Sequence, residues 1–467
     1  MTQQLGSVER PLRVAIVGSG PAGFYAAEHL FKKGGLHVEV DMFDRLPTPF
    51  GLVRLGVAPD HQKIKSVTRV FDRIAQNPCF HFFGNVEIGR DVTLDELKEH
   101  FHQICFATGA QTDRRMGIPG EDLPRSHAAT EFVAWFNGHP DYRDGEFDLS
   151  AERVAVVGVG NVAVDVARIL CRTPEELART DIADHALEAL RESKVRKVYM
   201  LGRRGPAQAA FTNPEVRELG ELEGADIHVP AEEAELDPLS LKEVASSDDD
   251  TLRKKVEIIQ DFAKRERTGK PRLLTLRFLV SPTELVAGED GGVRLMRLVR
   301  NALVDEDGKL GCRATAHTED LPVDLVFRSV GYRGVSIEGL PFHERWGLIP
   351  NELGRVTDPE SSRPLPGMYV SGWIKRGPSG VIGTNKKDGA ETAAAMLEDV
   401  AAGSVLEPSR PDPATLDALV RERQPHVVTY QDWTRLDQIE CSRGERDGRP
   451  RVKLTSRAEL LEALKGS

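Results

Sequence analysis

The sequence predicts an α/β protein with two doubly wound, three-layer domains, in which helices cover both faces of a parallel sheet. Two observations predict this class. Short apolar runs, such as VAIV (14–17) and VAVV (154–157), are each followed by a glycine-rich turn and a helical pattern. The segment RVAIVGSGPAG (13–23) is also nearly repeated as RVAVVGVGNVA (153–163). Buried parallel strands have continuous apolar runs, and the order strand, turn, helix begins a βαβ unit.

The first unit is predicted in three steps. Residues 14–17 form a strand, residues 21–33 form a helix ended by Gly34 and Gly35, and residues 37–43 form a second strand. Residues 46–61 follow. This segment contains three prolines and two glycines, so we predict a loop without regular structure.

The segment after this loop predicts an amphipathic helix. Its apolar face holds Ile64, Val67, Phe71 and Ile74. Four basic residues lie away from that face: Lys63, Lys65, Arg69 and Arg73. The sequence leaves two interpretations of these residues open, a solvated face and part of a docking surface for an acidic partner.

The remaining elements repeat the same pattern. We predict strands at ICFATGA (104–110), RKVYMLGRRGP (196–206), LVFRSVGYRG (325–334) and the start of residues 368–389. The second unit opens at Arg153, a glycine-rich loop ends near Gly389, and a helix covers about residues 390–400. LEPSRPDP (406–413) reads as a linker to a charged tail, and Asp248 to Asp250 are predicted to cap a helix.

Composition excludes several classes of function. The chain has 467 residues and a net charge of −11, which does not favour nucleic-acid binding. Its five cysteines contain no C-x-x-C pair, which argues against a zinc ribbon, a redox dithiol or a locally ligated iron–sulfur cluster. We find no signal-peptide core at the N-terminus and no apolar run long enough to span a membrane. We therefore expect a cytoplasmic protein.

Both glycine loops fit a dinucleotide-binding, Rossmann-like turn. The first is Gly18-x-Gly20-x-x-Gly23, and the second is Gly158-x-Gly160-x-x-Ala163. The first glycine allows the tight turn, the second lets the backbone approach a pyrophosphate, and the third position must be small. The phosphates then lie at a helix N-terminus. One such loop is weak evidence, but two copies predict two dinucleotide sites and electron transfer between their ligands.

The residues that end the second strand of each unit indicate which dinucleotide binds where. Asp44 ends the first of these strands, and its carboxylate can accept hydrogen bonds from the ribose of FAD or NAD. Arg203 and Arg204 end the other, and a guanidinium pair suits the 2′-phosphate of NADP. The simpler interpretation is a surface arginine pair, but the intact glycine loop before it favours NADP.

A set of longer motifs runs along the chain: GSGPAG, LPTPFGLVRLGVAPDHQKIKSV, ATGA, GNVAVDVARIL, GRRGPAQAAFT, SVGYRG, GWIKRGPSGVIGTNKKD and, in the tail, YQDWTRLDQIE and GRPRVKL. Together they resemble the motifs of the adrenodoxin-reductase-type ferredoxin–NADP reductases, particularly the bacterial members. The resemblance covers nearly the whole chain.

The resemblance implies an NADP domain inserted in a discontinuous FAD domain. We expect the FAD domain in residues 1–110 and 324–403, the NADP domain in residues 111–323, and an associated tail in residues 404–467. The cofactors would be FAD and NADP(H), and the partner a ferredoxin-type iron–sulfur protein. The oligomeric state stays open.

The resemblance and the glycine loops together give a set of site residues. The FAD residues are Gly18, Gly20, Ala22, Gly23, Asp44, Leu52, Val86, Trp373, Gly380, Val381 and Ile382. The NADP residues are Arg114, Val159, Gly160, Asn161, Val162, Arg203, Arg204, Glu215 and Gly380. His61 and Glu215 resemble the polar pair beside the reacting rings, and we expect no metal.

The predicted chemistry is transfer of a hydride from nicotinamide to flavin, followed by two single-electron transfers to the iron–sulfur protein. One segment departs from the family. Mitochondrial relatives place arginines on the NADP domain for docking, whereas PAEEAELDP (230–238) is acidic here. This departure leaves the docking surface and the identity of the partner open.

Four other interpretations compete with this one. The missing C-x-x-C pair argues against a dithiol reductase, and the lack of an N-terminal cysteine cluster argues against an electron-input subunit of the glutamate-synthase type. No substrate-pocket signature supports a flavin monooxygenase. A flavin-binding sensor without turnover also fits two glycine loops, but the Arg203–Arg204 pair favours use of NADPH.

Overall fold

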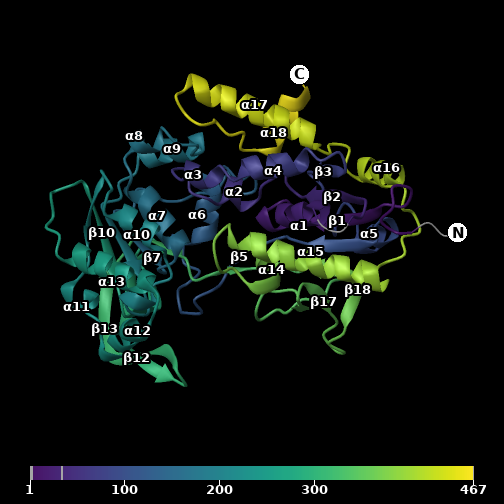
Figure 1. Ribbon diagram of the computed structural model, residues 1–467. Coiled ribbons are helices and arrows are strands. Elements are labelled where there is room, and N and C mark those ends of the chain that lie inside the picture. The colour runs from purple at the N-terminus through teal and green to yellow at the C-terminus, as the bar shows by residue number, and fades with distance from the viewer. Residues whose placement is uncertain (1–3, 33–34, 466–467) are drawn as a thin grey trace.

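The computed structural model describes residues 4–32 and 35–465, which are organised by two large sheets (Figure 1). The first sheet has seven strands, and its order reverses around β1, which lies between β4 and β2. Strands β18, β4, β1, β2 and β3 are parallel, whereas β17 and β16 add an antiparallel edge. In spatial order the strands are β16 (Asn351–Glu352), β17 (Arg355–Thr357), β18 (Pro364–Val370), β4 (Gln103–Phe106), β1 (Leu12–Val17), β2 (Val38–Asp44) and β3 (Phe80–Gly84).

The second sheet has six strands, all parallel, and its order reverses around β7. Its spatial order is β6 (Ser126–Ala128), β14 (Leu325–Arg328), β7 (Arg153–Val157), β8 (Lys197–Leu201), β10 (Arg272–Arg277) and β9 (Ala225–His228). Ligands of doubly wound sheets bind at the carboxyl ends of strands where the order reverses. Both glycine loops leave their sheets at such a point, after β1 and after β7.

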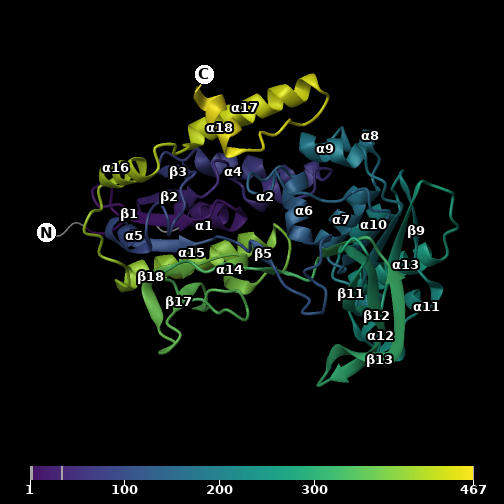
Figure 2. The same cartoon turned by 180° about the vertical axis from the view of Figure 1, so that it is seen from behind.

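The remaining strands form two small antiparallel sheets. The three-stranded sheet lies beside the six-stranded one, as Figure 2 shows from behind. It contains β11 (Val280–Ala287), β12 (Val293–Glu306) and β13 (Lys309–Pro322). A two-stranded ribbon pairs β5 (Thr112–Asp113) with β15 (Tyr332–Arg333), the segments by which the chain leaves the first sheet and returns to it.

Helices cover both large sheets. We call the seven-stranded sheet and its helices the β1 half, and the six-stranded sheet, the three-stranded sheet and their helices the β7 half. The β1 half contains α1 (Pro21–Lys32), α2 (Leu52–Leu55), α3 (Gln62–Lys65), α4 (Thr68–Ala75), α5 (Leu94–His100), α14 (Trp373–Arg376) and α15 (Thr384–Ala402). The β7 half contains α6 (Ala129–Phe136), α7 (Asn161–Cys171), α8 (Pro174–Leu177), α9 (Asp184–Arg191), η1 (Pro206–Gln208), α10 (Asn213–Leu219), α11 (Ala231–Ala234), α12 (Pro238–Ser246) and α13 (Asp250–Ala263).

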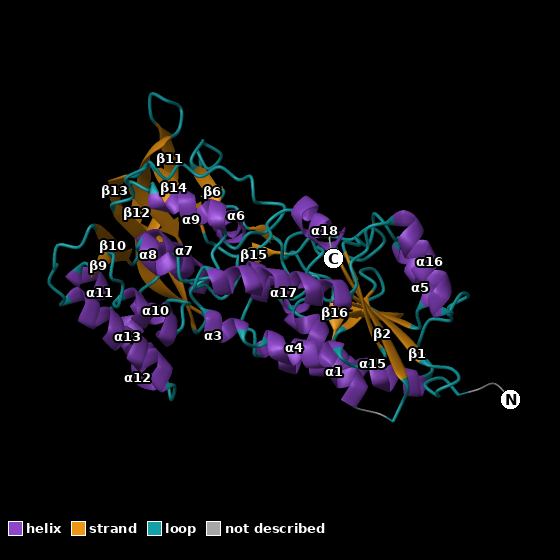
Figure 3. Cartoon of the chain, turned by 90° about the horizontal axis from the view of Figure 1, so that it is seen from above, coloured by secondary structure: helices purple, strands orange, loops and turns teal. Residues whose placement is uncertain are grey.

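The tail adds three helices: α16 (Pro413–Arg423), α17 (Tyr430–Arg446) and α18 (Arg457–Lys465). Seen from above, α17 runs across the junction of the two halves (Figure 3). Its Trp433 is buried against Phe50, with ring centroids 5.6 Å apart. The tail is therefore part of the hydrophobic core rather than an appendage.

The predicted fold class is confirmed, with two mainly parallel sheets, each containing one strand that ends in a glycine loop. One predicted border differs from the sheets. The resemblance implied an FAD domain that resumes at residue 324, but β14 pairs with β7 in the second sheet. The division into separately folding domains stays a prediction. No helix within the described residues is both long and apolar enough to cross a bilayer.

Three local expectations need correction or completion. The segment 46–61 contains one helical turn, α2, because its prolines lie outside residues 52–55. The amphipathic helix after it is broken into α3 and α4, and Ile64 is exposed. Lys65, one of the four basic residues for which a solvated face and a docking surface were both open, is instead buried and pairs with Asp181 of the β7 half at 2.7 Å. The end of the first helix at Lys33 and Gly34 lies outside the described residues.

Candidate active site

A cavity of about 1040 Å³ opens where the carboxyl edge of the first sheet faces the start of α7. It brings together ten of the eleven predicted flavin residues. These wall residues are Gly18, Gly20, Ala22, Asp44, Leu52, Val86, Trp373, Gly380, Val381 and Ile382. From the predicted NADP set, the wall also contains Asn161, Val162 and Glu215, and it contains His61 of the predicted polar pair. The remaining predicted residues lie outside it: Gly23, Arg114, Val159, Gly160, Arg203 and Arg204.

The first glycine loop has the geometry of an open cradle. Gly18 has a φ of +107°, and a Cβ there would lie 2.5 Å from the carbonyl oxygen of Ala107. A Cβ on Gly23 would lie 2.4 Å from the carbonyl oxygen of Gly18, so this residue allows α1 to approach β1. At Gly20, by contrast, a Cβ would meet no atom within 4 Å. The space in front of Gly20 and the free N–H groups of α1 suit a phosphate.

Asp44 is held rigidly at the end of β2. Its carboxylate accepts hydrogen bonds from the backbone N–H of Ser19 (3.0 Å), the Ser19 hydroxyl and the backbone N–H of Leu46 (2.9 Å). Burial raises the pKa of Asp44, and these hydrogen bonds oppose the rise. A carboxylate offers about four acceptor positions, so one remains for a ribose hydroxyl.

Two polar atoms on the cavity wall are buried without a hydrogen-bond partner among the described residues. They are the indole Nε1 of Trp373 and the hydroxyl of Thr108. The Trp373 ring lies against Tyr332, with centroids 5.4 Å apart. Buried polar groups are normally hydrogen-bonded, so unpaired ones on a cavity wall indicate a polar ligand.

The second glycine loop repeats the first. Gly158 has a φ of +137°, and a Cβ there would lie 2.3 Å from the carbonyl oxygen of Ser329, whereas a Cβ on Gly160 would meet nothing within 4 Å. Asn161 begins α7, and its Oδ1 accepts a hydrogen bond from the backbone N–H of Thr212 at 2.9 Å. This bond ties the loop to the N-terminus of α10, which carries Glu215.

The two arginines after β8 lie next to this loop but outside the cavity. Arg203 is exposed and Arg204 is half-buried. A Cβ on the preceding Gly202 would lie 3.0 Å from the side chain of Val159, so the end of β8 and the glycine loop touch. Arg114 lies elsewhere, directly after β5 of the two-stranded ribbon, where it donates to the carbonyl oxygen of Trp346 at 3.3 Å.

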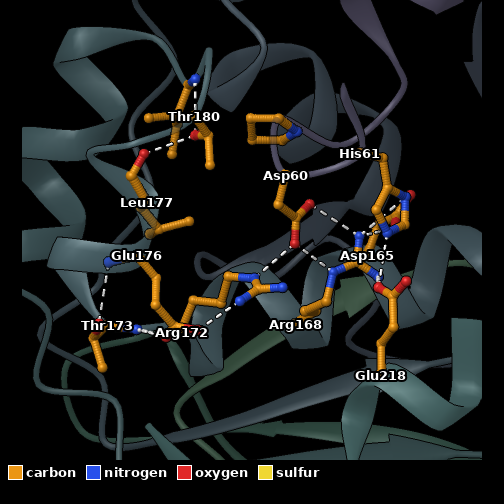
Figure 4. Close-up of polar contacts among 12 residues, drawn as sticks. Asp60, His61, Asp165, Arg168, Arg172, Thr173, Glu176, Leu177, Thr180 and Glu218 are labelled. Carbon is orange, nitrogen blue, oxygen red and sulfur yellow. Dashed lines mark hydrogen bonds and ion pairs between the residues drawn. The ribbon is translucent and has the colours of Figure 1, made fainter. Parts of the chain in front are cut away.

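His61 and Glu215 come from different halves of the molecule and meet at the cavity wall. The Nε2 atom of His61 lies 3.7 Å from Glu215 and makes a 2.8 Å hydrogen bond with Glu218. Figure 4 shows Glu218 directed at the His61 ring. Sequence reasoning missed Glu218, although it lies one helical turn after Glu215, on the same face of α10.

A buried guanidinium organises this contact (Figure 4). Arg168 on α7 is fully buried and donates to Asp60 (2.6 and 3.1 Å), Asp165 (2.7 Å) and Glu215 (3.3 Å). Asp60 belongs to the β1 half and also accepts from Arg172 at 2.7 Å. The sequence carried one signal of this network, the spacing of Asp165 and Arg168 by three residues on a helix.

The cluster shifts the pKa values of its members. Burial opposes protonation of His61, but the hydrogen bond with Glu218 and the charges of Glu215 and Asp60 hold its pKa above the usual value. Burial raises the pKa of Asp165 to about 6, against the pull of Arg168. His61 and Asp165 therefore hold a proton more readily than isolated side chains would, whereas the hydrogen bond with His61 lowers the pKa of Glu218 and the charge of Arg168 lowers that of Asp60 despite its burial.

Comparisons with known proteins agree with this geometry. A family of pyridine nucleotide-disulphide oxidoreductases matches residues 12–202. The NADPH-ferredoxin reductase FprA of Mycobacterium tuberculosis H37Rv is 47% identical over 97% of this chain and 99% of its own. Human mitochondrial NADPH:adrenodoxin oxidoreductase is 41% identical over 98% of this chain and 92% of its own. The solved structure of M. tuberculosis FprA in complex with NADPH, 45% identical, superposes with a TM-score of 0.92 over 98% of this chain and all of the other.

Proposed function

Because the chain belongs to the family of NADPH-ferredoxin reductases and NADPH:adrenodoxin oxidoreductases, we propose that it transfers electrons from NADPH through FAD to a ferredoxin-type iron–sulfur protein. One observation in the structure of this chain supports the proposal most directly. A single cavity is lined by the first glycine loop, by the start of α7 after the second loop, and by the His61–Glu215 pair between them.

The cavity fits a flavin nucleotide. The open space at Gly20 and the N-terminus of α1 would hold the pyrophosphate, and Asp44 would accept from the ribose. The unpaired Nε1 of Trp373 and the hydroxyl of Thr108 offer donors to the rest of the group. When bound, a flavin would accept two electrons as a hydride and release them one at a time to a one-electron acceptor.

The chain's own residues position the nicotinamide and hold a proton. The carboxylate of Glu215 lies on the cavity wall, where it can accept from a carboxamide N–H. The Nε2–H of His61 is directed at Glu218, and this hydrogen bond together with the charge of Glu215 raises the pKa of His61 despite its burial. We assign to His61 the holding of a proton beside the reacting rings. Arg168 keeps both side chains in place.

Selectivity for NADPH over NADH is assigned to Arg203 and Arg204. If each contributes about 1.5 kcal/mol to binding of the 2′-phosphate, Arg203→Ala raises the Kd for NADPH about tenfold, and the same change at Arg204 does likewise. Affinity for NADH stays unchanged because NADH lacks this phosphate. Titration of the oxidised protein with each nucleotide measures both constants. An unchanged ratio of the two Kd values in the double variant would refute the assignment.

The experiment that tests the function uses the yellow, FAD-loaded protein without air. Addition of NADPH should bleach the flavin, and an oxidised ferredoxin added next should restore the colour while the ferredoxin becomes reduced. NADH at the same concentration serves as the control and should react more slowly. Stable colour under excess NADPH would favour a flavin-binding sensor without turnover.

The docking surface and the location complete the proposal. Of the acidic residues in segment 230–238, Glu233 is buried and pairs with Arg277, whereas Glu232 is exposed. Only part of this segment can therefore repel an acidic partner. We propose a cytoplasmic location, which the five free cysteines support.

A further inference from the structure

Three potential metal ligands converge at the edge of the candidate active site. The Nε2 of His61 and one carboxylate oxygen each from Glu215 and Glu218 all lie within 4.8 Å of one another. Two of these distances are 2.8 Å (His61–Glu218) and 3.7 Å (His61–Glu215). Tetrahedral Zn²⁺, with ligands about 2.0–2.2 Å away, separates its ligand atoms by about 3.4 Å. These two separations differ from the tetrahedral value by about 0.6 and 0.3 Å, so small side-chain movements bring His61 into range of both carboxylates.

The charges around the triad favour a divalent cation. Four carboxylates meet here, from Asp60, Asp165, Glu215 and Glu218. They face two guanidinium groups, Arg168 and Arg172, so with a neutral His61 the cluster carries two excess negative charges. Arg168 lies 3.3 Å from Glu215 and 3.7 Å from Glu218, and it competes with a metal for these oxygens. Its shorter contacts with Asp60 and Asp165 remain when that competition is lost.

The triad is also accessible. His61 and Glu215 line the cavity, and the side chain of Glu218 is 38% exposed. An ion can therefore enter, and water can occupy the fourth coordination position that three protein ligands leave open. On binding, Zn²⁺ takes the position of the Nε2 proton of His61. That proton leaves to solvent, and the hydrogen bond to Glu218 becomes a shared metal contact.

We propose that His61, Glu215 and Glu218 form a Zn²⁺ site through which the metal inhibits the protein. Bound zinc occupies the Nε2 of His61 and the carboxylate of Glu215, the two groups assigned to the reacting rings. It also links α3 of the β1 half to α10 of the β7 half. Binding of the metal does not depend on the proposed function, whereas the inhibition rests on it.

The first test measures binding directly. Calorimetric titration of the FAD-loaded protein with zinc chloride should give one Zn²⁺ per chain, and Mg²⁺ should not bind because it prefers oxygen ligands and retains its water. Glu218→Gln should weaken zinc binding at least about tenfold, and His61→Gln should weaken it as well. Glu221→Gln is the matched control, because Glu221 is an exposed acid just beyond α10. It should bind zinc as the unaltered protein does.

The second test follows reduction of the flavin by NADPH without air. Zinc should slow the reaction, a chelator should restore it, and Glu218→Gln should need at least about tenfold more zinc for the same inhibition. Lack of binding at one zinc per chain, or binding that Glu218→Gln leaves unchanged, would overturn the site. Binding without slower reduction would overturn the inhibition. No reaction with NADPH even in the absence of zinc would instead overturn the proposed function, and the calorimetric result would still stand.

Discussion

Burial changes the behaviour of single ionisable side chains in this molecule, and His102 is a clear case. Its side chain is 4% exposed at the start of β4, and its Nδ1 accepts a hydrogen bond from the backbone N–H of Arg13 at 3.1 Å. Only neutral histidine can accept at Nδ1. Burial, together with the positive charges of Arg10 and Arg13, lowers the pKa of His102 to about 4.

This residue makes stability depend on pH. The pKa is lower in the folded state, so between about pH 6.5 and 4 the unfolded chain binds the extra proton. Its contribution is present above pH 6.5 and is lost as the pH falls towards 4, by up to about 3 kcal/mol. His102→Asn keeps an acceptor near Nδ1 but cannot titrate. Urea-unfolding midpoints between pH 7 and 5 should therefore fall less steeply in the variant.

The control for this prediction is the exposed His317 on β13. His317→Asn should follow the same pH profile as the unaltered protein. Equal slopes for His102→Asn and the unaltered protein would contradict the assigned role.

At the residue scale the sequence predicted the local conformation of single residues well, but it predicted contacts between distant side chains less well. The local pattern predicted the tight turn at Gly18 and the open space at Gly20 and Gly160, because a glycine turn is defined by its own backbone. The 2.8 Å contact of His61 with Glu218 rather than Glu215 depends on how α3 packs against α10. That packing joins residues 157 positions apart, and no local spacing encodes it.

Among the elements, the tail has the structural role that the sequence left undefined. Lys453 is buried between the halves and donates to the carbonyl oxygens of Asn137 (3.0 Å) and Arg54 (3.3 Å). It also lies 3.5 Å from Asp181, which Lys65 contacts at 2.7 Å. Two cations, one from α3 and one from the tail, therefore share a single carboxylate of the β7 half.

The shared ion pair predicts how the stability losses of three variants should rank. Asp181→Asn leaves two buried ammonium groups without their counter-ion and should lower the free energy of unfolding by about 3–5 kcal/mol. Lys453→Met leaves the Lys65–Asp181 pair intact and should cost less. The double variant should be more stable than the sum of the two effects predicts, because the two side chains are in contact. Urea unfolding of the four proteins measures the cycle, with Lys465→Met at an exposed position as the neutral control. Additive effects would contradict the shared pairing.

The boundaries of helices and strands were predictable where a short stretch of sequence determines the strand or the helix cap. Asp249 caps α13, as the acidic run predicted, and β1, β2, β7 and β8 lie where the apolar runs were. The break between α3 and α4 was not predictable, because the apolar pattern runs through residues 65–68 without a proline or glycine to mark it. The assignment of β14 to the second sheet is also a matter of tertiary pairing, since both sheets need an apolar strand there.

At the scale of the whole molecule, each half contains one glycine loop of the same geometry. A substitution in one loop should therefore weaken the binding of one nucleotide and leave the binding of the other unchanged. Gly20 and Gly160 both face open space, so alanine fits the fold at either position, and neither has a positive φ. The added methyl group instead occupies space that a pyrophosphate needs. Loss of one or two charge-assisted hydrogen bonds, at about 1.5–3 kcal/mol each, weakens binding at least about tenfold.

The expected result is a crossed pattern. Gly20→Ala should fold with the stability of the unaltered apoprotein but retain little FAD, whereas Gly160→Ala should remain yellow with an NADPH Kd raised about tenfold or more. Flavin absorbance and NADPH titration measure the two losses. Gly18→Ala and Gly158→Ala are the structural controls. Their Cβ atoms would lie 2.5 and 2.3 Å from backbone oxygens, and both residues have positive φ, so these variants should lose stability itself. If Gly160→Ala lost flavin, or Gly20→Ala kept it, the assignment of one nucleotide to each loop would be wrong, and both loops would have to act on a single ligand.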